Sequence, residues 1–359
     1  MAFPPPDRHC CSPRSRPTTF GRTALLAALL SSLAATAVRA NDRVRVQSPE
    51  KAGVVVLIGE IDDYLGDQLT IRLKTGPETV PQEQILEVET YYTPSHREGL
   101  ALLDRGETDK ALTTLQAALK EENRRWVKRE IFAAIVRAQT RRGDLLAAAR
   151  TFTEILATDP GTRHWSVAPL AWTPRALGVP LRTQAREWLV GDRPELRLIG
   201  GSLLLFDPVY GEAAQRELTE LSRSPQRPLA PLARAQMWRV RFQGKALTET
   251  ELARWRTEIQ HLPSSLRAGP QYLLARGYLS RNATRDAAAE FLWLPTVYTD
   301  LESLSARALW DAAAALRESA AESESTTLLG ELIERFPWST EAAEAKGMLT
   351  APPGGGPAE

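Results

Sequence analysis

Two kinds of hydrophobic pattern divide this chain. Between residues 41 and 93, apolar residues are contiguous, as in Val54–Ile61, or alternate with polar ones, as in Leu69–Leu73. Alternation with a period of two is typical of strands that bury one face. The turn-forming pairs Gly66-Asp67 and Gly76-Pro77 separate these segments. The pattern predicts about four or five short strands, and we expect a small N-terminal β-barrel module over residues 41–93.

From Pro94 onward the pattern changes to that of helices. Glycine and proline there mostly separate alanine- and leucine-rich stretches, as expected for a succession of antiparallel helix pairs. Every tryptophan lies at or beyond Trp126, so the helical part should have the larger aromatic core. The predicted fold class is mainly α, with the helix pairs preceded by the small β-barrel.

The helical part contains copies of one sequence pattern. The clearest copy spans Glu130–Pro160, with Gly143-Asp144 as the turn between its two helices. Its inward-facing positions are Phe132, Ile135, Val136, Ala148, Phe152 and Ile155. A second copy precedes it over residues 99–118, and two more follow over residues 271–295 and 309–337. In repeats of this kind, each helix pair buries its apolar face against the next pair.

These copies resemble the tetratricopeptide repeat (TPR). The resemblance implies a TPR-like α-solenoid in three parts: a TPR pair at 94–160, irregular helical repeats with an insert at 161–263, and a TPR pair with a capping helix at 264–350. The β segment resembles small Sm-like or SH3-like barrels through Gly59–Asp63, Leu69–Leu73 and Val80–Val88. The last residues, 351–359, include three consecutive glycines and are predicted to be a disordered tail.

The first forty residues have the order of an export signal. Four arginines precede an apolar run from Thr23 to Val38, and Val38 and Ala40 provide small residues before a cleavage site. We therefore predict a signal peptide over residues 1–40 and a periplasmic or extracellular location, of the bacterial exported type. The alternative is an uncleaved N-terminal helix that anchors the protein. Both cysteines, Cys10 and Cys11, lie in this segment, so the mature chain is expected to have none.

The remaining titratable residues do not form a recognisable catalytic or metal-binding pattern. His96, His164 and His261 are isolated in the sequence, so we expect no metal, no cofactor and no catalytic residues. The adjacent carboxylates Asp62-Asp63 and Glu121-Glu122 are predicted to be solvated, because neighbouring residues point in different directions. The formal net charge of +1 does not indicate a nucleic-acid partner.

The glycine pair Gly200-Gly201 lies inside a predicted helix and lacks the spacing of a phosphate-binding loop. We interpret it as a site of close helix packing.

The TPR resemblance implies that first helices line a concave groove where a partner binds. Exposed first-helix positions, one turn apart, make up the predicted partner-binding groove: Glu130, Arg137, Arg141, Tyr272, Arg276, Arg307, Trp310 and Arg317. Arginine recurs in this set and can bond carboxylates through two N–H groups, which suits an acidic segment or a terminal carboxylate. The alternative, that these are ordinary solvated arginines, stays open.

The sequence therefore predicts a non-catalytic extracytoplasmic scaffold that binds another protein or peptide in the concave face of a TPR solenoid. Two alternatives remain. One is a structural subunit of a cell-envelope or secretion assembly. The other is an enzyme whose titratable groups converge from distant repeats, which would require a deep pocket.

Overall fold

A computed structural model describes residues 41–48, 53–226, 228–244, 246–299 and 301–350 of the chain. The predicted signal peptide over 1–40 and the predicted disordered tail over 351–359 lie outside the described residues. The described residues belong to one compact unit. Within this part of the chain, no helix combines the length and apolarity that crossing a membrane requires.

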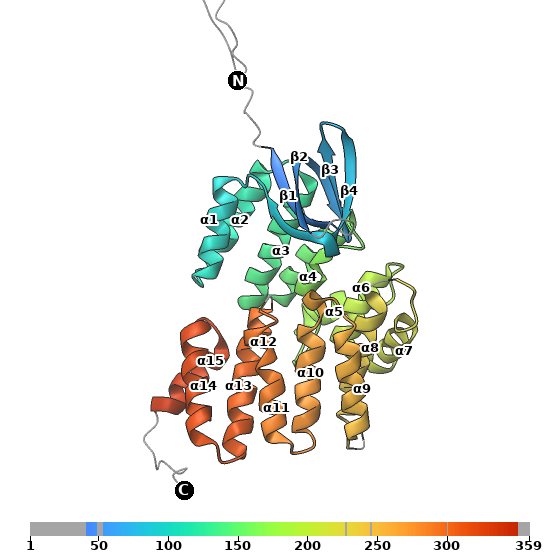
Figure 1. Cartoon of the computed structure of the whole chain (residues 1–359). Helices are drawn as coiled ribbons and strands as arrows, with labels where there is room; N and C mark the ends of the chain where they lie inside the picture. Colours follow the sequence, from blue (N-terminus) through green and yellow to red (C-terminus); the bar gives the residue numbers. More distant parts are fainter. Residues whose placement is uncertain (1–40, 49–52, 227, 245, 300, 351–359) are drawn as a thin grey trace, which may run out of the picture. The chain divides into compact units, whose positions relative to one another are not determined.

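Five antiparallel strands form the N-terminal sheet (Figure 1): β1 (Asp42–Ser48), β2 (Gly53–Leu65), β3 (Gln68–Leu73), β4 (Gly76–Pro81) and β5 (Ile85–Glu89). Their order is β4-β3-β2-β1-β5. The long strand β2 pairs with β1 through its first half and with β3 through its second half, and the pairing with β3 is interrupted by a bulge between Ile61 and Asp63. The strand prediction is confirmed. No ladder joins β4 to β5 in the described residues, so closure into a barrel stays a prediction.

Four helices follow the sheet: α1 (Pro94–Asp104), α2 (Thr108–Glu121), α3 (Arg125–Arg141) and α4 (Leu145–Thr158). Consecutive helices pack on one another, and a single apolar cluster joins α1–α3 to the sheet. Close packing between α1 and α2 depends on Gly99, because a Cβ at this position would lie 2.7 Å from the Leu115 side chain. The turn between α3 and α4 contains Gly143 at φ +79°, a conformation that favours glycine.

The middle of the chain forms five helices: α5 (Val179–Leu189), α6 (Pro194–Leu204), α7 (Gly211–Leu221), α8 (Leu229–Arg241) and α9 (Glu249–Gln260). The predicted close packing at Gly200-Gly201 is confirmed. A Cβ at Gly200 would lie 2.5 Å from the carbonyl oxygen of Ala185, so α5 and α6 could not approach as they do with a larger residue there. The single-turn 3₁₀ helices Gln82–Gln84, Arg163–Val167 and Ser264–Leu266 lie in connections.

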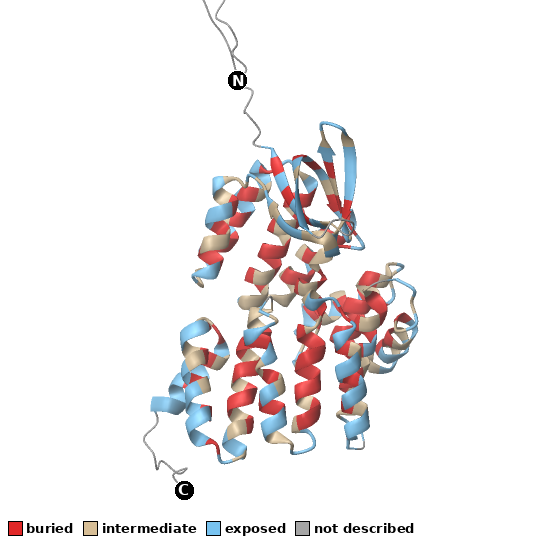
Figure 2. Ribbon diagram, viewed as in Figure 1, coloured by how far each residue is buried: buried red, intermediate tan, exposed pale blue. Residues whose placement is uncertain are grey.

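The C-terminal helices are α10 (Ala268–Leu279), α11 (Thr284–Phe291), α12 (Trp293–Thr296), α13 (Glu302–Glu318), α14 (Glu322–Arg335) and α15 (Thr340–Thr350). The helices α10, α11, α13 and α14 lie side by side in Figure 1, each packed on the next. Figure 2 shows α10 as buried along almost its whole length. The chain is thus mainly helical with a small antiparallel sheet, as predicted at that level.

A buried arginine ties the sheet to the helices. Arg129 of α3 is 2% exposed and donates from Nη2 to the Asp63 carboxylate and, over 2.9 Å, to the Tyr64 carbonyl oxygen, both on β2. Its Nε lies 3.9 Å from Asp159, just after α4, and Asp159 accepts from the Gly66 N–H. The prediction that Asp63 is solvated holds only in part, because its side chain is 26% exposed and pairs with Arg129.

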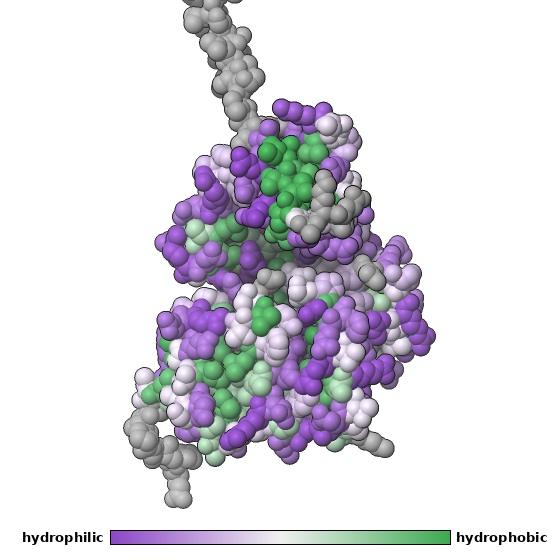
Figure 3. All heavy atoms as spheres, in the orientation of Figure 1, coloured by the Kyte–Doolittle hydropathy of each residue, from purple (hydrophilic) through white to green (hydrophobic). Residues whose placement is uncertain are grey.

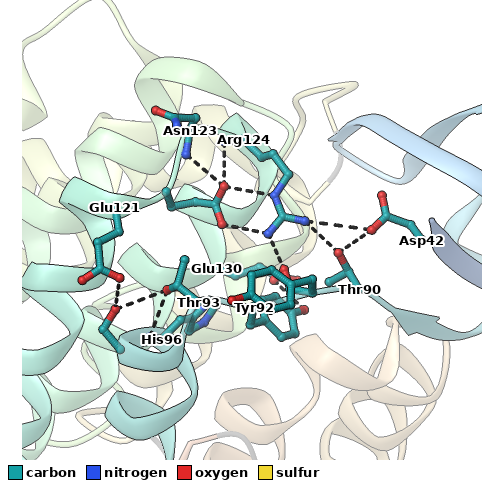
Figure 4. A network of polar contacts seen from close by, with 12 residues as sticks. Asp42, Thr90, Tyr92, Thr93, His96, Glu121, Asn123, Arg124 and Glu130 are labelled. Atoms are coloured by element: carbon teal, nitrogen blue, oxygen red, sulfur yellow. Dashed lines mark hydrogen bonds and ion pairs between the residues drawn. The ribbon is translucent and has the colours of Figure 1, made fainter. Parts of the chain in front are cut away.

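A second polar network joins β1 and β5 to the start of α3 (Figure 4). Arg124 bonds Glu122 over 2.8 Å and the Thr90 hydroxyl over 2.8 Å, and Thr90 donates to Asp42 over 2.5 Å. Glu122 is 5% exposed and also accepts from the N–H groups of Asn123 and Arg124. The prediction of a solvated Glu121-Glu122 pair is therefore wrong for Glu122, which closes the loop between two helices.

Candidate functional site

The helices line an open cavity of about 1160 Å³. Its walls come from α3, α5, α6, α8, α10, α13, the start of α15, and a proline-containing loop over residues 167–177. The charged residues that line it are mostly arginines: Arg137, Arg141, Arg175, Arg182, Arg239, Arg276 and Arg307 against Asp207, Glu302 and Glu341. We call this the arginine cavity. Its lining carries an excess of positive charge although the whole chain is close to neutral.

Arg239 of α8 is the most unusual of these arginines. It is 6% exposed, and no carboxylate in the described residues pairs with it. Its Nη1 donates to the carbonyl oxygen of Ser202 over 2.8 Å and to Gln236 Oε1 over 2.7 Å, and its guanidinium lies 5.0 Å from the centre of the Phe206 ring. Burial lowers the pKa of Arg239 to about 10, so it stays charged at neutral pH.

A buried polar cluster fixes the position of Arg239 and of the loop beside it. The Ser202 hydroxyl donates to Gln236 Oε1 over 3.0 Å and accepts from the backbone N–H of Ala171 over 2.8 Å. Ser202 and Gln236 are both fully buried. Because one serine bonds both the loop and the partner of Arg239, the wall of the cavity at this point has little freedom to rearrange.

The loop over residues 167–177 reaches the cavity through Trp172. The Trp172 indole lies against α10 at Gly269, where a Cβ would come within 2.1 Å of the ring. Upstream of the loop, Trp165 packs edge-on against Phe152 at 5.4 Å between ring centres. The insert packs on α4, α6 and α10 and forms part of the cavity wall.

The opposite wall brings the two ends of the helical part together. Arg141 of α3 forms an ion pair with Glu302 of α13, and its guanidinium lies 4.7 Å from the centre of the Trp338 ring, ahead of α15. Burial, together with the charge of Arg137, lowers the pKa of Arg141 to about 10. Its Nε is buried and bonds no acceptor in the described residues. Arg141, like Arg239, is therefore a cation whose charged form is disfavoured by its buried surroundings.

Three other arginines in the lining contact a carboxylate or an aromatic ring. Arg182 lies 2.5 Å from Asp207, and Arg307 lies 3.0 Å from Asp311. Arg276 of α10 lies 5.9 Å from the centre of the Phe242 ring. Arginines stacked on aromatic rings present their N–H groups at the ring edge, ready for a planar anion.

Four residues of the predicted groove meet in this cavity, namely Arg137, Arg141, Arg276 and Arg307. They lie on α3, α10 and α13, the first helices of three predicted repeat copies. The structure thus brings together positions that lie up to 170 residues apart in the chain, Arg137 and Arg307 being the extremes.

The other four predicted groove residues are not in the cavity lining. Glu130 accepts from the Tyr92 hydroxyl over 2.9 Å and pairs with Arg163. Tyr272 is fully buried and donates to Asp311 over 2.6 Å, so its predicted exposure is wrong: α10 is covered on nearly all sides. Trp310 packs on the apolar cluster of the C-terminal helices, and Arg317 donates to Met348 Sδ over 3.8 Å.

Sequence reasoning missed several residues that line the cavity: Trp172, Arg175, Arg182, Arg239 and Trp338. Trp172 and Arg175 belong to an insert without helical periodicity. Arg182 and Arg239 lie in the middle helices, where the repeat register could not be assigned. The aromatic residues in the proline-containing insert were the one available signal.

The arrangement is chemically suited to binding anions rather than to proton transfer. Guanidinium groups are strong donors that stay charged across the physiological range, so they bind carboxylates well and act poorly as acids or bases. His96, by contrast, is 1% exposed beneath Tyr92, away from the cavity. No group of three histidines, cysteines or carboxylates in the described residues is placed to hold a metal ion.

Comparisons with models of known protein families and with curated proteins found no match to this chain.

Proposed function

We propose that this protein is a non-catalytic interaction protein whose arginine cavity binds an acidic segment of a partner protein. One observation carries the proposal: seven arginines against three acidic residues line one cavity, and Arg239 is buried there with no carboxylate bonded to it among the described residues. Isolated buried cations are costly, and an anionic ligand would offset that cost.

The size of the cavity supports a segment of chain as the ligand. A volume of about 1160 Å³ lies above the range of roughly 300–1,000 Å³ for small-molecule pockets. The aromatic rings of Trp172, Phe206, Phe242 and Trp338 add flat apolar surface between the charges. A short acidic segment with an apolar or aromatic residue would use both kinds of surface.

We further propose that the helices form a TPR-like α-solenoid and that the protein acts outside the cytoplasm. Supporting the solenoid, the repeat copies coincide with the helix pairs α1–α2, α3–α4, α10–α11 and α13–α14, and the arginines face inward from the first helices of the last three. The export proposal rests on the sequence of residues 1–40 alone.

Fluorescence anisotropy with labelled peptides tests the proposal. A ten-residue glutamate-rich peptide should bind the full chain, and a glutamine-rich peptide of the same length should bind at least about tenfold more weakly, since each charged hydrogen bond contributes about 1.5–3 kcal/mol. Affinity should fall as salt is raised. Equal binding of the two peptides, or none of either, would count against an acidic ligand.

A pair of variants with the same change in charge locates the binding. Arg276→Glu reverses a charge in the cavity lining, whereas Arg285→Glu reverses an exposed charge on α11 outside it. We expect Arg276→Glu to weaken binding of the acidic peptide at least tenfold and Arg285→Glu to change it less than twofold. Equal losses would mean that only the overall charge of the chain matters.

A further inference from the structure

The first half of β2 has a free edge. Residues Gly53–Gly59 pair with β1 along one edge, and pairing with β3 begins only at Glu60. Along the other edge of residues 53–58, no ladder partner is present in the described part of the chain, whereas β3 already reaches Gly59, where a Cβ would lie 2.2 Å from the Arg72 carbonyl oxygen. The backbone N–H and C=O groups of a free edge can pair with another strand.

The side chains along this edge are apolar and exposed. Val54, Val55, Val56 and Ile58 are 47%, 40%, 49% and 50% exposed. Because successive residues of a strand point to opposite faces, both faces are uncovered near Val55. Figure 3 shows a continuous apolar patch over the strands.

The two arginines of β1 lie one strand away from this edge and are already paired. Arg43 and Arg45 of β1 lie opposite Ile58 and Val56. On the far side of β1 they meet β5, with Arg45 2.8 Å from Glu87 and Arg43 3.9 Å from Glu89. The segment Gly53–Gly59 has no charged residue and no proline. It therefore lacks the side chains that commonly keep free edges from pairing.

We propose that this edge pairs with the same edge of a second copy of the chain, as two antiparallel strands. With the twofold axis at Val56, Val54 lies opposite Ile58 and Val55 lies opposite Leu57, so every cross-strand pair is apolar. An edge of this composition is complementary to itself, which favours a second copy over a charged partner strand. Cross-strand pairs of β-branched residues are favourable in sheets.

Electrostatic repulsion does not oppose this arrangement. The β1 strands of the two copies are separated by the two β2 strands, which is three strand spacings or about 14 Å. At physiological salt the Debye length is about 8 Å, and each arginine also has its glutamate partner. The contact is nevertheless small beside the roughly 20–30 residues per side of a standard interface, so the dimer should be weak and should depend on concentration.

Sedimentation velocity of the full chain over a wide concentration range tests the proposal. The sedimentation coefficient of the wild type should rise toward that of a dimer as concentration increases. Val56→Lys should weaken dimerisation at least tenfold, because two lysines would then face each other at the twofold axis. The matched control Val190→Lys changes a valine that is 78% exposed after α5 and should leave dimerisation unchanged.

Hydrogen exchange of the wild type gives a second measure that needs no variant. Amide exchange in residues 53–59 should slow as concentration rises, while the exposed surfaces of α11 and α14 should not change. The proposal is overturned if the wild type is monomeric at every concentration. It is equally overturned if Val56→Lys dimerises as tightly as wild type, or if the concentration-dependent protection falls outside β2.

Discussion

Arg239 shows how one residue sets the chemistry of the cavity. Its cation is buried on Phe206 and bonded only to uncharged oxygens. Replacing it with methionine keeps the apolar stem and removes the charge. We expect Arg239→Met to weaken binding of the glutamate-rich peptide at least tenfold in anisotropy titrations. Its free energy of unfolding in urea should change by no more than about 2 kcal/mol, because removing an unpaired buried charge offsets the hydrogen bonds lost.

The control for this substitution is Arg285→Met, which removes an exposed charge outside the cavity. It should leave both binding and stability within error of the wild type. If Arg239→Met bound the peptide as well as Arg285→Met does, Arg239 would be a packing residue with no part in recognition.

His96 makes the stability of the N-terminal part depend on pH. Burial is the largest cause that lowers the pKa of His96; Glu122 raises it and Arg124 lowers it. Its Nδ1 is buried and bonds no acceptor in the described residues. The folded state therefore binds a proton on the His96 imidazole less tightly than the unfolded state does. The stability that neutral His96 provides is complete above the unfolded pKa of about 6.5 and is lost as pH falls below it.

We expect the free energy of unfolding of the wild type to fall more steeply between about pH 7 and pH 5 than that of His96→Phe. Urea unfolding at several pH values measures this. The comparison cancels the part that His164 contributes, since its pKa is also lowered by burial and by nearby arginines. Parallel curves for the two proteins would show that His96 titrates as it does in the unfolded chain.

Among the elements, the sheet and the first helices depend on each other through Arg129. This side chain of α3 bonds β2 and approaches Asp159 after α4. Arg129→Met leaves Asp63 and Asp159 without their cation, and we expect a loss of about 3–5 kcal/mol in the free energy of unfolding. Arg125→Met, at an exposed site on the same helix, should cost less than about 0.5 kcal/mol. Similar losses for both would contradict the proposed role of Arg129.

The elements themselves could largely be predicted from the sequence. Periodicity and turn residues located the strands and the helix pairs, and the glycine pair indicated the close contact at Gly200. These features are local, because glycine, proline and alternating polarity act over a few residues.

Contacts between distant segments could not be predicted in the same way. The burial of Tyr272 depends on helices that surround α10 on nearly all sides. The pairing of Asp63 depends on a bulge in β2, and the pairing of Arg141 with Glu302 joins residues 161 positions apart. The residues around an arginine in a helix do not show whether its side chain is exposed to solvent, pairs with a carboxylate or lines a cavity.

At the scale of the whole compact unit, contacts between its first and last helices close the arginine cavity. Trp338 lies beside Arg141 and also beside Gly106, where a Cβ would be 3.2 Å from its ring. Glu302 neutralises Arg141 at this junction. The net charge of the lining is therefore set jointly by both ends of the helical part.

Removing that acid should strengthen binding. We expect Glu302→Gln to tighten binding of the glutamate-rich peptide by about two- to fivefold, since a free arginine can bond the ligand and each unit of charge at the surface contributes about 1 kcal/mol or less. Glu324→Gln, an exposed site on α14, should have no effect. Anisotropy titrations at low salt measure both. If the Glu302→Gln variant bound the peptide more weakly than the wild type, the ion pair between Arg141 and Glu302 would itself be part of the binding site.

The central claim is that the arginine cavity is where an acidic segment binds, and photo-crosslinking tests it most directly. A glutamate-rich peptide carrying one benzophenone group would be irradiated with the full chain, and the linked residues identified by mass spectrometry. The account predicts links to residues 167–177 and to the cavity-lining parts of α8, α10 and α13, lost when excess unlabelled glutamate-rich peptide is added. Links spread over the exposed faces of α11 and α14, with none in the cavity lining, would contradict it.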